Sequence, residues 1–308
     1  MPTYILGIES SCDDTSASVL CDGKVLSNLV ANQEIHKTYG GVVPELASRA
    51  HQQNIIPIVN QAISLANIDK NQLNAIAYTR GPGLLGSLLV GSSFSKSLSM
   101  GLRVPLIEVN HMQAHLLAHF IEDCNKKKPK FPFLGITISG GHTQIVLVKD
   151  YFEMQVIGET LDDAIGETFD KCGKMMGLSY PAGPIIDKNS KLGNSLKFVF
   201  TKPKVEGLNF SFSGLKTGFL RFIEKESKMK DDFISNEVNN LCASLQKTIV
   251  DILFEKINYA VKETGIKNIV FGGGVSCNTG IINKFNENKN DFKVFSPKFE
   301  YTTDNAAM

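Results

Sequence analysis

The chain has 308 residues, of which 43% are hydrophobic and 20% are charged, and its formal net charge is +1. This composition excludes a disordered chain and is that of a globular protein long enough for two domains. With so small a net charge, any role with nucleic acid must depend on a local surface or on a partner protein.

The same features indicate a cytoplasmic protein with no membrane association. The six cysteines form no C-x-x-C pair, which predicts reduced thiols rather than disulfides. The N-terminus enters a strand without a basic and then apolar leader, so we expect no secretory signal. The most apolar long segment, 84–102, is interrupted by Gly91 and Lys96 and predicts a buried helix.

Strands and helices are expected to alternate along the chain, which predicts an α/β fold with mixed sheets. A helix is expected to start at Pro44 and to run towards Ala66, with Pro57 bending or splitting it. A long helix is predicted from the apolar spacing over 238–263. The expected strands are 4–9, 16–20, 24–29, 73–79, 105–109 and 267–271, with a hairpin over 135–148.

The hairpin over 135–148 turns at Ser139-Gly140-Gly141-His142-Thr143, where two glycines let the backbone approach a ligand and its N–H groups can face an anion. The chain begins with a related unit, because Leu6-Gly7-Ile8 matches Leu134-Gly135-Ile136 and both precede a small polar loop that ends in Thr. Two such hairpins are the pattern of the duplicated actin-like, sugar-kinase-like ATPase fold. In that fold, two lobes hold a nucleotide in the central cleft between them.

Two histidines stand one helical turn apart. His111 and His115 lie at i and i+4, on one face of a predicted helix, where they can share a metal ion or serve as hydrogen-bonding groups. The glutamate of H-E-x-x-H is missing, which counts against a zinc peptidase of that type.

An acidic segment follows the central hairpin. Thr160 is expected to cap a helix together with Asp163, and the spacing places Asp163, Glu167 and Asp170 on one helical face. That face suits a cation or ribose hydroxyls, or it is simply solvated. Farther on, the strand 267–271 runs into a glycine loop and then a helix, an arrangement that binds nucleotides.

Taken together, these segments resemble the TsaD family of tRNA N6-adenosine threonylcarbamoyltransferases over essentially the whole chain. The matching segments are G-I-E-S-S-C-D-D-T (7–15), N-H-M-Q-A-H (110–115), S-G-G-H-T (139–143), E-T-L-D-D-A-I-G-E-T-F-D-K (159–171), Y-P-A-G-P (180–184), F-S-F-S-G-L-K-T (210–217), G-G-G-V-S-C-N (272–278) and T-D-N-A-A-M (303–308).

The resemblance implies an acyltransferase that moves the threonylcarbamoyl group from threonylcarbamoyl-AMP to N6 of adenosine 37 in tRNAs reading ANN codons, with AMP as the leaving group. It implies one divalent metal per subunit, usually iron(II), held by His111, His115 and Asp304. Two imidazoles and a carboxylate suit a first-row divalent metal. The residues implied to contact the adenylate are Thr137, Ile138, Ser139, Gly140, Gly141, Asp170, Gly183, Asp187 and Asn278.

No protein nucleophile is required when AMP leaves, and none is assigned. The implied partners are tRNA, a TsaB-like paralogue with the same fold and a TsaE-like ATPase, with the adenylate supplied by a threonylcarbamoyl-AMP synthase. The alternatives are a metallopeptidase and a non-catalytic nucleotide-binding scaffold.

The domain organisation expected from sequence is an N-terminal lobe over 1–109 and a C-terminal lobe over 110–308, with a helical insertion at about 151–245. The chain ends in a loop with the first residues of a helix, so we expect a final helix of the second lobe to be missing.

Overall fold

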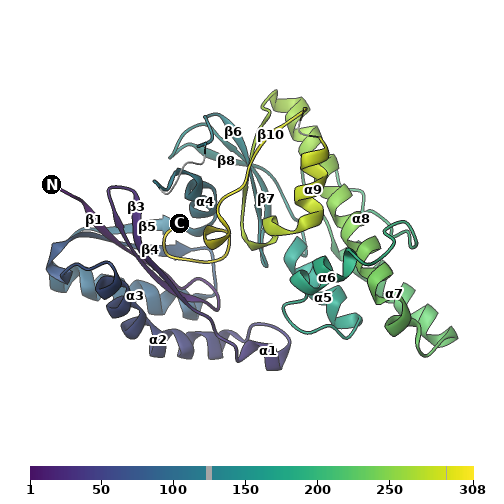
Figure 1. Cartoon of the computed structure of the whole chain (residues 1–308), viewed down its shortest axis with the longest axis horizontal. Coiled ribbons are helices and arrows are strands. Elements are labelled where there is room, and N and C mark those ends of the chain that lie inside the picture. Colours follow the sequence, from purple (N-terminus) through teal and green to yellow (C-terminus); the bar gives the residue numbers. More distant parts are fainter. Residues whose placement is uncertain (123–126, 289) are drawn as a thin grey trace. The chain divides into compact units, whose positions relative to one another are not determined.

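The computed structural model describes residues 1–122, 127–288 and 290–308. Its contacts divide the chain into unit 1, Met1–Pro129 with Pro297–Met308, and unit 2, Lys130–Ser296 (Figure 1). This division differs from the expected boundary at 109/110. The helix after residue 110 packs on the last strands of unit 1, and the C-terminal segment returns to the first strands of the same unit.

Unit 1 is built on one mixed five-stranded sheet in the order β3-β2-β1-β4-β5. β1 is antiparallel to β2 and parallel to β4. Helices α2 and α3 pack side by side on the sheet, and α4 follows β5 directly. The elements are β1 (Tyr4–Glu9), β2 (Thr15–Cys21), β3 (Lys24–Ala31), α1 (His36–Tyr39), α2 (Pro44–Leu65), β4 (Leu73–Gly81), α3 (Leu85–Leu102), β5 (Leu106–Asn110) and α4 (His111–Leu117).

Unit 2 has a second five-stranded sheet in the order β10-β9-β6-β7-β8. α6 packs along α8, and α5 packs along α6 and α7. Its core is rich in fully buried phenylalanines: Phe133, Phe169, Phe210, Phe212, Phe219 and Phe285. The elements are β6 (Phe133–Ile138), β7 (Thr143–Val148), β8 (Met154–Glu159), α5 (Ile165–Met175), α6 (Ala182–Ser190), α7 (Ser213–Met229), α8 (Phe233–Thr264), β9 (Asn268–Gly272), α9 (Thr279–Glu287) and β10 (Lys293–Phe295).

The two sheets have the same topology. In each, the first strand of the unit pairs antiparallel with the second and parallel with the fourth, and the fifth strand lies parallel at the edge beside the fourth. The two matching segments found in the sequence are β1 and β6, which hold equivalent places. The internal duplication predicted from sequence is therefore present in the fold.

Some local expectations hold and others are wrong. Pro57 lies inside α2 and does not split it. The expected insertion at 151–245 begins with β8, which belongs to the sheet, and its last helix, α8, continues to Thr264. Thr160 does not cap α5, because the helix starts at Ile165 and the Thr160 hydroxyl instead donates to the Asp163 carbonyl.

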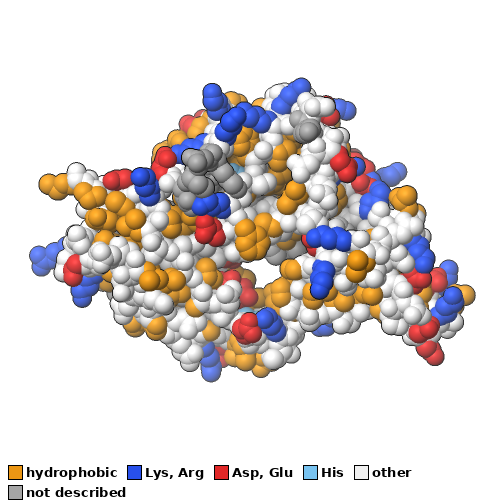
Figure 2. Space-filling view, viewed as in Figure 1, with side chains coloured by type: hydrophobic (Ala, Val, Ile, Leu, Met, Phe, Trp, Pro, Cys, Tyr) orange, Lys and Arg blue, Asp and Glu red, His pale blue; other side chains and the backbone are white. Residues whose placement is uncertain are grey.

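The described cysteines are free thiols, and Cys124 lies outside the described residues. Figure 2 shows lysine and arginine side chains interspersed with aspartates and glutamates, mostly towards the edges of the face drawn, consistent with the net charge of +1. In the part of the chain that the structure describes, no helix is both long and apolar enough to span a bilayer.

Candidate functional site

His111 and His115 lie on α4, one turn apart, as the sequence predicts. The helix is fixed at its start by Asn110, whose Oδ1 accepts hydrogen bonds from the N–H groups of Met112 (3.0 Å) and Gln113 (3.2 Å). Both imidazoles are buried, and their ring centroids are 4.6 Å apart.

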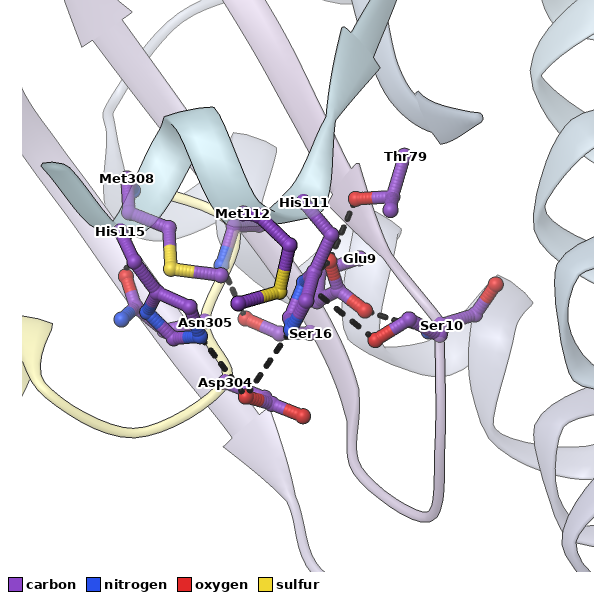
Figure 3. Close-up of polar contacts among 12 residues, drawn as sticks. Glu9, Ser10, Ser16, Thr79, His111, Met112, His115, Asp304, Asn305 and Met308 are labelled. Atoms are coloured by element: carbon purple, nitrogen blue, oxygen red, sulfur yellow. Dashed lines mark hydrogen bonds and ion pairs between the residues drawn. The ribbon is translucent and has the colours of Figure 1, made fainter. Parts of the chain in front are cut away.

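The third predicted ligand, Asp304, comes from the far end of the sequence and meets the two histidines within unit 1 (Figure 3). Its Oδ1 lies 3.5 Å from His111 Nε2 and 3.6 Å from His115 Nε2. One potential ligand atom from each residue lies within 4.8 Å of the other two. The structure thus brings together three residues that sequence spacing alone could not connect.

The segment carrying Asp304 is anchored to the first two strands. The Ala306 N–H donates to the Ser16 hydroxyl on β2 at 2.8 Å. The Ala306 carbonyl oxygen lies against Gly7 on β1, so close that a Cβ at Gly7 would be 2.3 Å from it. Asn305 turns the chain by accepting from the N–H groups of Ala307 (3.1 Å) and Met308 (3.3 Å).

Glu9, at the end of β1, orients His111. The His111 Nδ1–H donates to Glu9 Oε2 at 3.2 Å, and the same carboxylate accepts from the Thr79 hydroxyl and the Ser11 N–H. Burial disfavours the charged forms of both Glu9 and His111, but the hydrogen bond and the charge attraction between them have the larger effect. The pKa of Glu9 is therefore lowered, and the pKa of His111 is raised to about 9. The contact leaves Nε2 of His111 directed at Asp304, which is how carboxylates orient metal-bound imidazoles.

The donor set fits a metal ion. His115 is fully buried, and neither of its ring nitrogens has a hydrogen-bond partner among the described residues. A buried polar group without a partner is unfavourable unless something absent from the chain itself satisfies it. Metal–ligand bonds of about 2.1 Å separate neighbouring ligand atoms by about 3 to 3.5 Å. The distances from Asp304 Oδ1 to the two histidine Nε2 atoms, 3.5 and 3.6 Å, are close to this. We conclude that His111, His115 and Asp304 can hold a divalent cation.

The hairpin predicted to hold a phosphate lies in unit 2, between β6 and β7. Ser139 N–H donates to the His142 carbonyl at 2.9 Å, and the Ser139 hydroxyl accepts from His142 N–H at 3.1 Å, which closes the turn. Gly140 and Gly141 at its tip have open space where a side chain would project. Thr137 and Ile138, just before the turn, are fully buried within β6.

Two glycines bring neighbouring elements against this turn. A Cβ at Gly166, in the first turn of α5, would lie 2.6 Å from the Ser139 carbonyl oxygen, and one at Gly273 would lie 2.4 Å from that of Ile138. The predicted phosphate turn is therefore packed between the start of α5 and the glycine loop after β9.

Asp170 and Gly183 meet at the start of α6. One carboxylate oxygen of Asp170, on α5, accepts from the Ala182 N–H at 2.7 Å. Burial raises the pKa of Asp170 above its ordinary value, although the backbone N–H groups of Ala182 and Gly183 act in the opposite direction. Asp170 therefore places a negative charge at the start of α6, where the helix dipole favours it.

Asp187 and Asn278 meet at the start of α9. Asp187 Oδ1 accepts from both the N–H (3.0 Å) and the hydroxyl (2.8 Å) of Thr279. Asn278 caps the same helix, since its Oδ1 accepts from the Ile281 N–H at 3.2 Å. All nine residues predicted to contact the adenylate thus lie in unit 2 and cluster around the starts of α5, α6 and α9.

The acidic face predicted over 163–170 is not free to bind a cation. Asp163 lies 2.7 Å from the amines of both Lys171 and Lys216, and Glu167 lies 2.7 Å from Lys171. The cation alternative fails for Asp163 and Glu167, because sequence spacing does not show which lysines of α5 and α7 lie beside them. Asp163 also precedes the helix, which begins at Ile165.

Sequence reasoning assigned no role to Glu9, Ser16 or Gly7, although all three support the candidate metal site. Glu9 could have been suspected from its place at the end of an apolar strand, where it is buried. A buried acid needs a partner, which would have prompted a search for one.

The fold and the site together define a class: a duplicated α/β protein with an actin-like topology, a His-His-Asp cluster in one unit that could hold a metal ion, and a glycine-rich turn in the other. Residues 24–308 match the family model of the tRNA N6-adenosine threonylcarbamoyltransferase TsaD. The chain belongs to this family of acyltransferases, and the resemblance noted in its sequence is confirmed.

Curated relatives with the same name as the family model match this chain over nearly its full length. The chain is 63% identical over 306 residues to the tRNA N6-adenosine threonylcarbamoyltransferase of Christiangramia forsetii, covering 99% of this chain and 90% of the relative. It is 61% identical over 308 residues to the protein of the same name from Riemerella anatipestifer, with the same coverage of both chains.

Solved structures of low sequence identity support the fold alone. HypF of T. kodakarensis matches with a TM-score of 0.64 at 14% identity, over 99% of this chain and 46% of that one. Component A of the Acidaminococcus fermentans (R)-2-hydroxyglutaryl-CoA dehydratase matches with a TM-score of 0.54 at 13% identity, over 97% and 95% of the two chains.

Proposed function

We propose that the protein transfers the threonylcarbamoyl group from threonylcarbamoyl-AMP to N6 of adenosine 37 in tRNAs that read ANN codons. The observation that carries the proposal is the 63% identity, over 99% of the chain, to a curated tRNA N6-adenosine threonylcarbamoyltransferase. In the reaction, the adenosine N6 attacks the carbamoyl carbon, a C–N bond forms and the C–O bond to the phosphate breaks. AMP leaves with the electron pair, and N6 loses one proton.

For the metal, the proposal assigns His111, His115 and Asp304 as ligands of one iron(II) ion. It is supported by the ring nitrogens of His115, which make no hydrogen bond to any described residue. When bound, such an ion supplies positive charge that stabilises an anionic oxygen. The chain's own part is to hold His111 in one tautomer, through Glu9, so that its Nε2 is available as a ligand.

For the adenylate, unit 2 supplies the binding groups. Backbone N–H groups of Gly140 and Gly141 face the phosphate, supported by the open space at the two glycines. Ser139 shapes this turn through its two hydrogen bonds with the His142 backbone. Asp170 and Asp187 accept from ribose hydroxyls or the threonyl amine, and Gly183 and Asn278 complete the adenosine side. Thr137 and Ile138 support the phosphate turn from within β6.

The expected partners follow from the family resemblance. We expect tRNA as the acceptor, a TsaB-like paralogue and a TsaE-like ATPase as partner proteins, and a separate synthase as the source of the adenylate. A cytoplasmic site of action fits the free thiols of the described cysteines. The metallopeptidase and scaffold alternatives are not favoured by the family to which the chain belongs.

The function is tested by incubating the protein, its partner proteins, iron(II) and threonylcarbamoyl-AMP with an ANN-decoding tRNA, followed by mass spectrometry of the nucleosides. Threonylcarbamoyladenosine is expected, and a tRNA with guanosine at position 37 should stay unmodified. The Christiangramia forsetii relative serves as the positive control. The proposal would be abandoned if that relative modified the tRNA and this protein did not.

An Asp170→Asn variant is expected to bind AMP about ten- to hundredfold more weakly, because a hydrogen bond to a charged group contributes roughly 1.5 to 3 kcal/mol. The same substitution should also change how folding stability depends on pH. A carboxyl with a raised pKa in the folded state favours folding in its protonated form, so wild type should gain stability over the variant as the pH falls through that pKa. Calorimetry of AMP binding and unfolding measured against pH check the two effects.

Glu167→Gln, on the same helix, is the matched control and should leave AMP affinity unchanged. If the Asp170→Asn variant bound AMP like wild type while the pH effect remained, Asp170 would only cap α6 and would not contact the adenylate.

A further inference from the structure

A buried amide connects Asn278 and Asp187, two of the residues proposed to contact the adenylate. Gln246 lies on α8, is 6% exposed and has the apolar residues Leu245 and Ile249 close to it in sequence. A primary amide is stable in such a place only if its hydrogen bonds are made. Its Oε1 accepts from Asn278 Nδ2 at 2.7 Å, and its Nε2 donates to the Ser190 hydroxyl at 2.9 Å.

These hydrogen bonds are part of a ring of contacts that closes through the backbone, and the donor and the acceptor in each of them are fixed. The Ile281 N–H can only donate, so Asn278 must present Oδ1 to it and Nδ2 to Gln246. Gln246 must then present its oxygen to Asn278 and its amine to Ser190. The Ser190 hydroxyl, accepting from Gln246, donates its own hydrogen to the Asp187 carbonyl at 2.8 Å.

The Asp187 side chain closes the ring, because it accepts from Thr279, the residue after Asn278. The ring therefore joins the end of α6, the middle of α8 and the start of α9. Gly280 leaves room for it, since a Cβ there would lie 2.7 Å from Gln246 Nε2 and 3.1 Å from Asn278 Oδ1.

We propose that Gln246 is a positioning residue for the adenylate: it holds Asn278 and Asp187 in one mutual arrangement at the start of α9. The inference rests on the proposed function, because it takes these two residues as adenylate contacts. An apolar side chain at 246 would pack in the same place without fixing either residue, and the adenylate would then have to order them on binding. Gln246 thus acts on affinity, not on the transfer step.

The test uses Gln246→Met, which keeps an unbranched side chain of similar length but can neither donate to Ser190 nor accept from Asn278 as an amide does. Its Kd for AMP and its KM for threonylcarbamoyl-AMP should rise about tenfold, the loss expected for one or two hydrogen bonds, while kcat stays within about twofold of wild type. Lys247→Ala, the next residue on α8 and paired with Asp251 instead, is the control and should bind AMP like wild type.

A second set of variants separates positioning from stability. Ser190→Ala should weaken AMP binding, and Ser190→Thr, which keeps the hydroxyl, should restore it. Gly280→Ala should weaken AMP binding too, by displacing the end of the Gln246 side chain, although alanine is the better helix former. These variants decide the question if Gln246→Met does not fold.

The outcomes are distinguishable. Wild-type protein that fails to bind AMP would contradict the proposed adenylate function itself. Wild-type protein that binds AMP, with Gln246→Met and Ser190→Ala binding it equally well, would overturn the role of Gln246 alone. A loss of thermal stability in these variants without a change in AMP affinity would also overturn it, because the ring would then be purely structural.

Discussion

Replacing His115 with leucine is expected to abolish metal binding and threonylcarbamoyl transfer while leaving the metal-free protein at least as stable as wild type. His115 is fully buried and has two ring nitrogens without hydrogen-bond partners among the described residues. Such unsatisfied groups destabilise a fold by roughly 1 to 3 kcal/mol, and a leucine of similar size removes them. The loss of one ligand of three should lower metal affinity more than the roughly 10- to 100-fold typical of changes in a ligand's supporting residues.

Two measurements check this prediction. Bound iron is determined after anaerobic incubation with iron(II), and thermal unfolding is followed with iron(II) and with a chelator. Iron(II) should raise the melting temperature of wild type, because a ligand that binds only the folded state stabilises it, and should have no effect on the variant. Gln113→Ala, on the same helix, is the control and should behave as wild type. A His115→Leu variant that keeps its iron would remove His115 from the ligand set.

The metal site shows what sequence spacing can and cannot supply. The i, i+4 spacing placed His111 and His115 on one face, because helical geometry is local. Asp304 lies far along the chain from both, and only the resemblance to a family connected them. Glu9, Gly7 and Ser16 were missed, since their roles depend on how β1 and β2 receive the C-terminal segment, and no periodicity records such a contact.

In unit 2, the elements were more predictable than the polar contacts. The alternation of strands and helices and the internal duplication both follow from local patterns, and the two sheets confirm them. The failures concern side-chain partners. Thr160 resembled a helix cap but bonds to a loop carbonyl, and Asp163 resembled a free acid but pairs with lysines of two helices. Gln246 gave no signal, because one amide in an apolar helix is visible only once its neighbours are placed.

Replacing Gly7 is expected to weaken both folding and metal binding, because Gly7 allows the segment carrying Asp304 to lie close to β1 and to the histidines. In a Gly7→Ala variant, the new Cβ would lie 2.3 Å from the Ala306 carbonyl oxygen, and a backbone atom cannot rotate away as a side-chain end can. The segment must shift, which should weaken the bond from Ala306 N–H to Ser16 and move Asp304 away from His111 and His115. We expect stability to fall by about 1 to 3 kcal/mol and iron(II) affinity to fall about tenfold or more.

Gly101→Ala is the matched control for this change. Gly101 lies near the end of α3, and a Cβ there would meet nothing within 4 Å. The same substitution should therefore stabilise the protein, by roughly 0.5 to 1 kcal/mol, and leave iron(II) affinity unchanged. Both variants are compared by chemical denaturation and by iron(II) titration. If close packing at Gly7 sets the ligand geometry, Gly7→Ala loses stability and iron(II) affinity, whereas Gly101→Ala gains stability and keeps its affinity. If Gly7→Ala lost stability but bound iron(II) as tightly as wild type, Asp304 would be positioned independently of β1, or would not bind the metal at all.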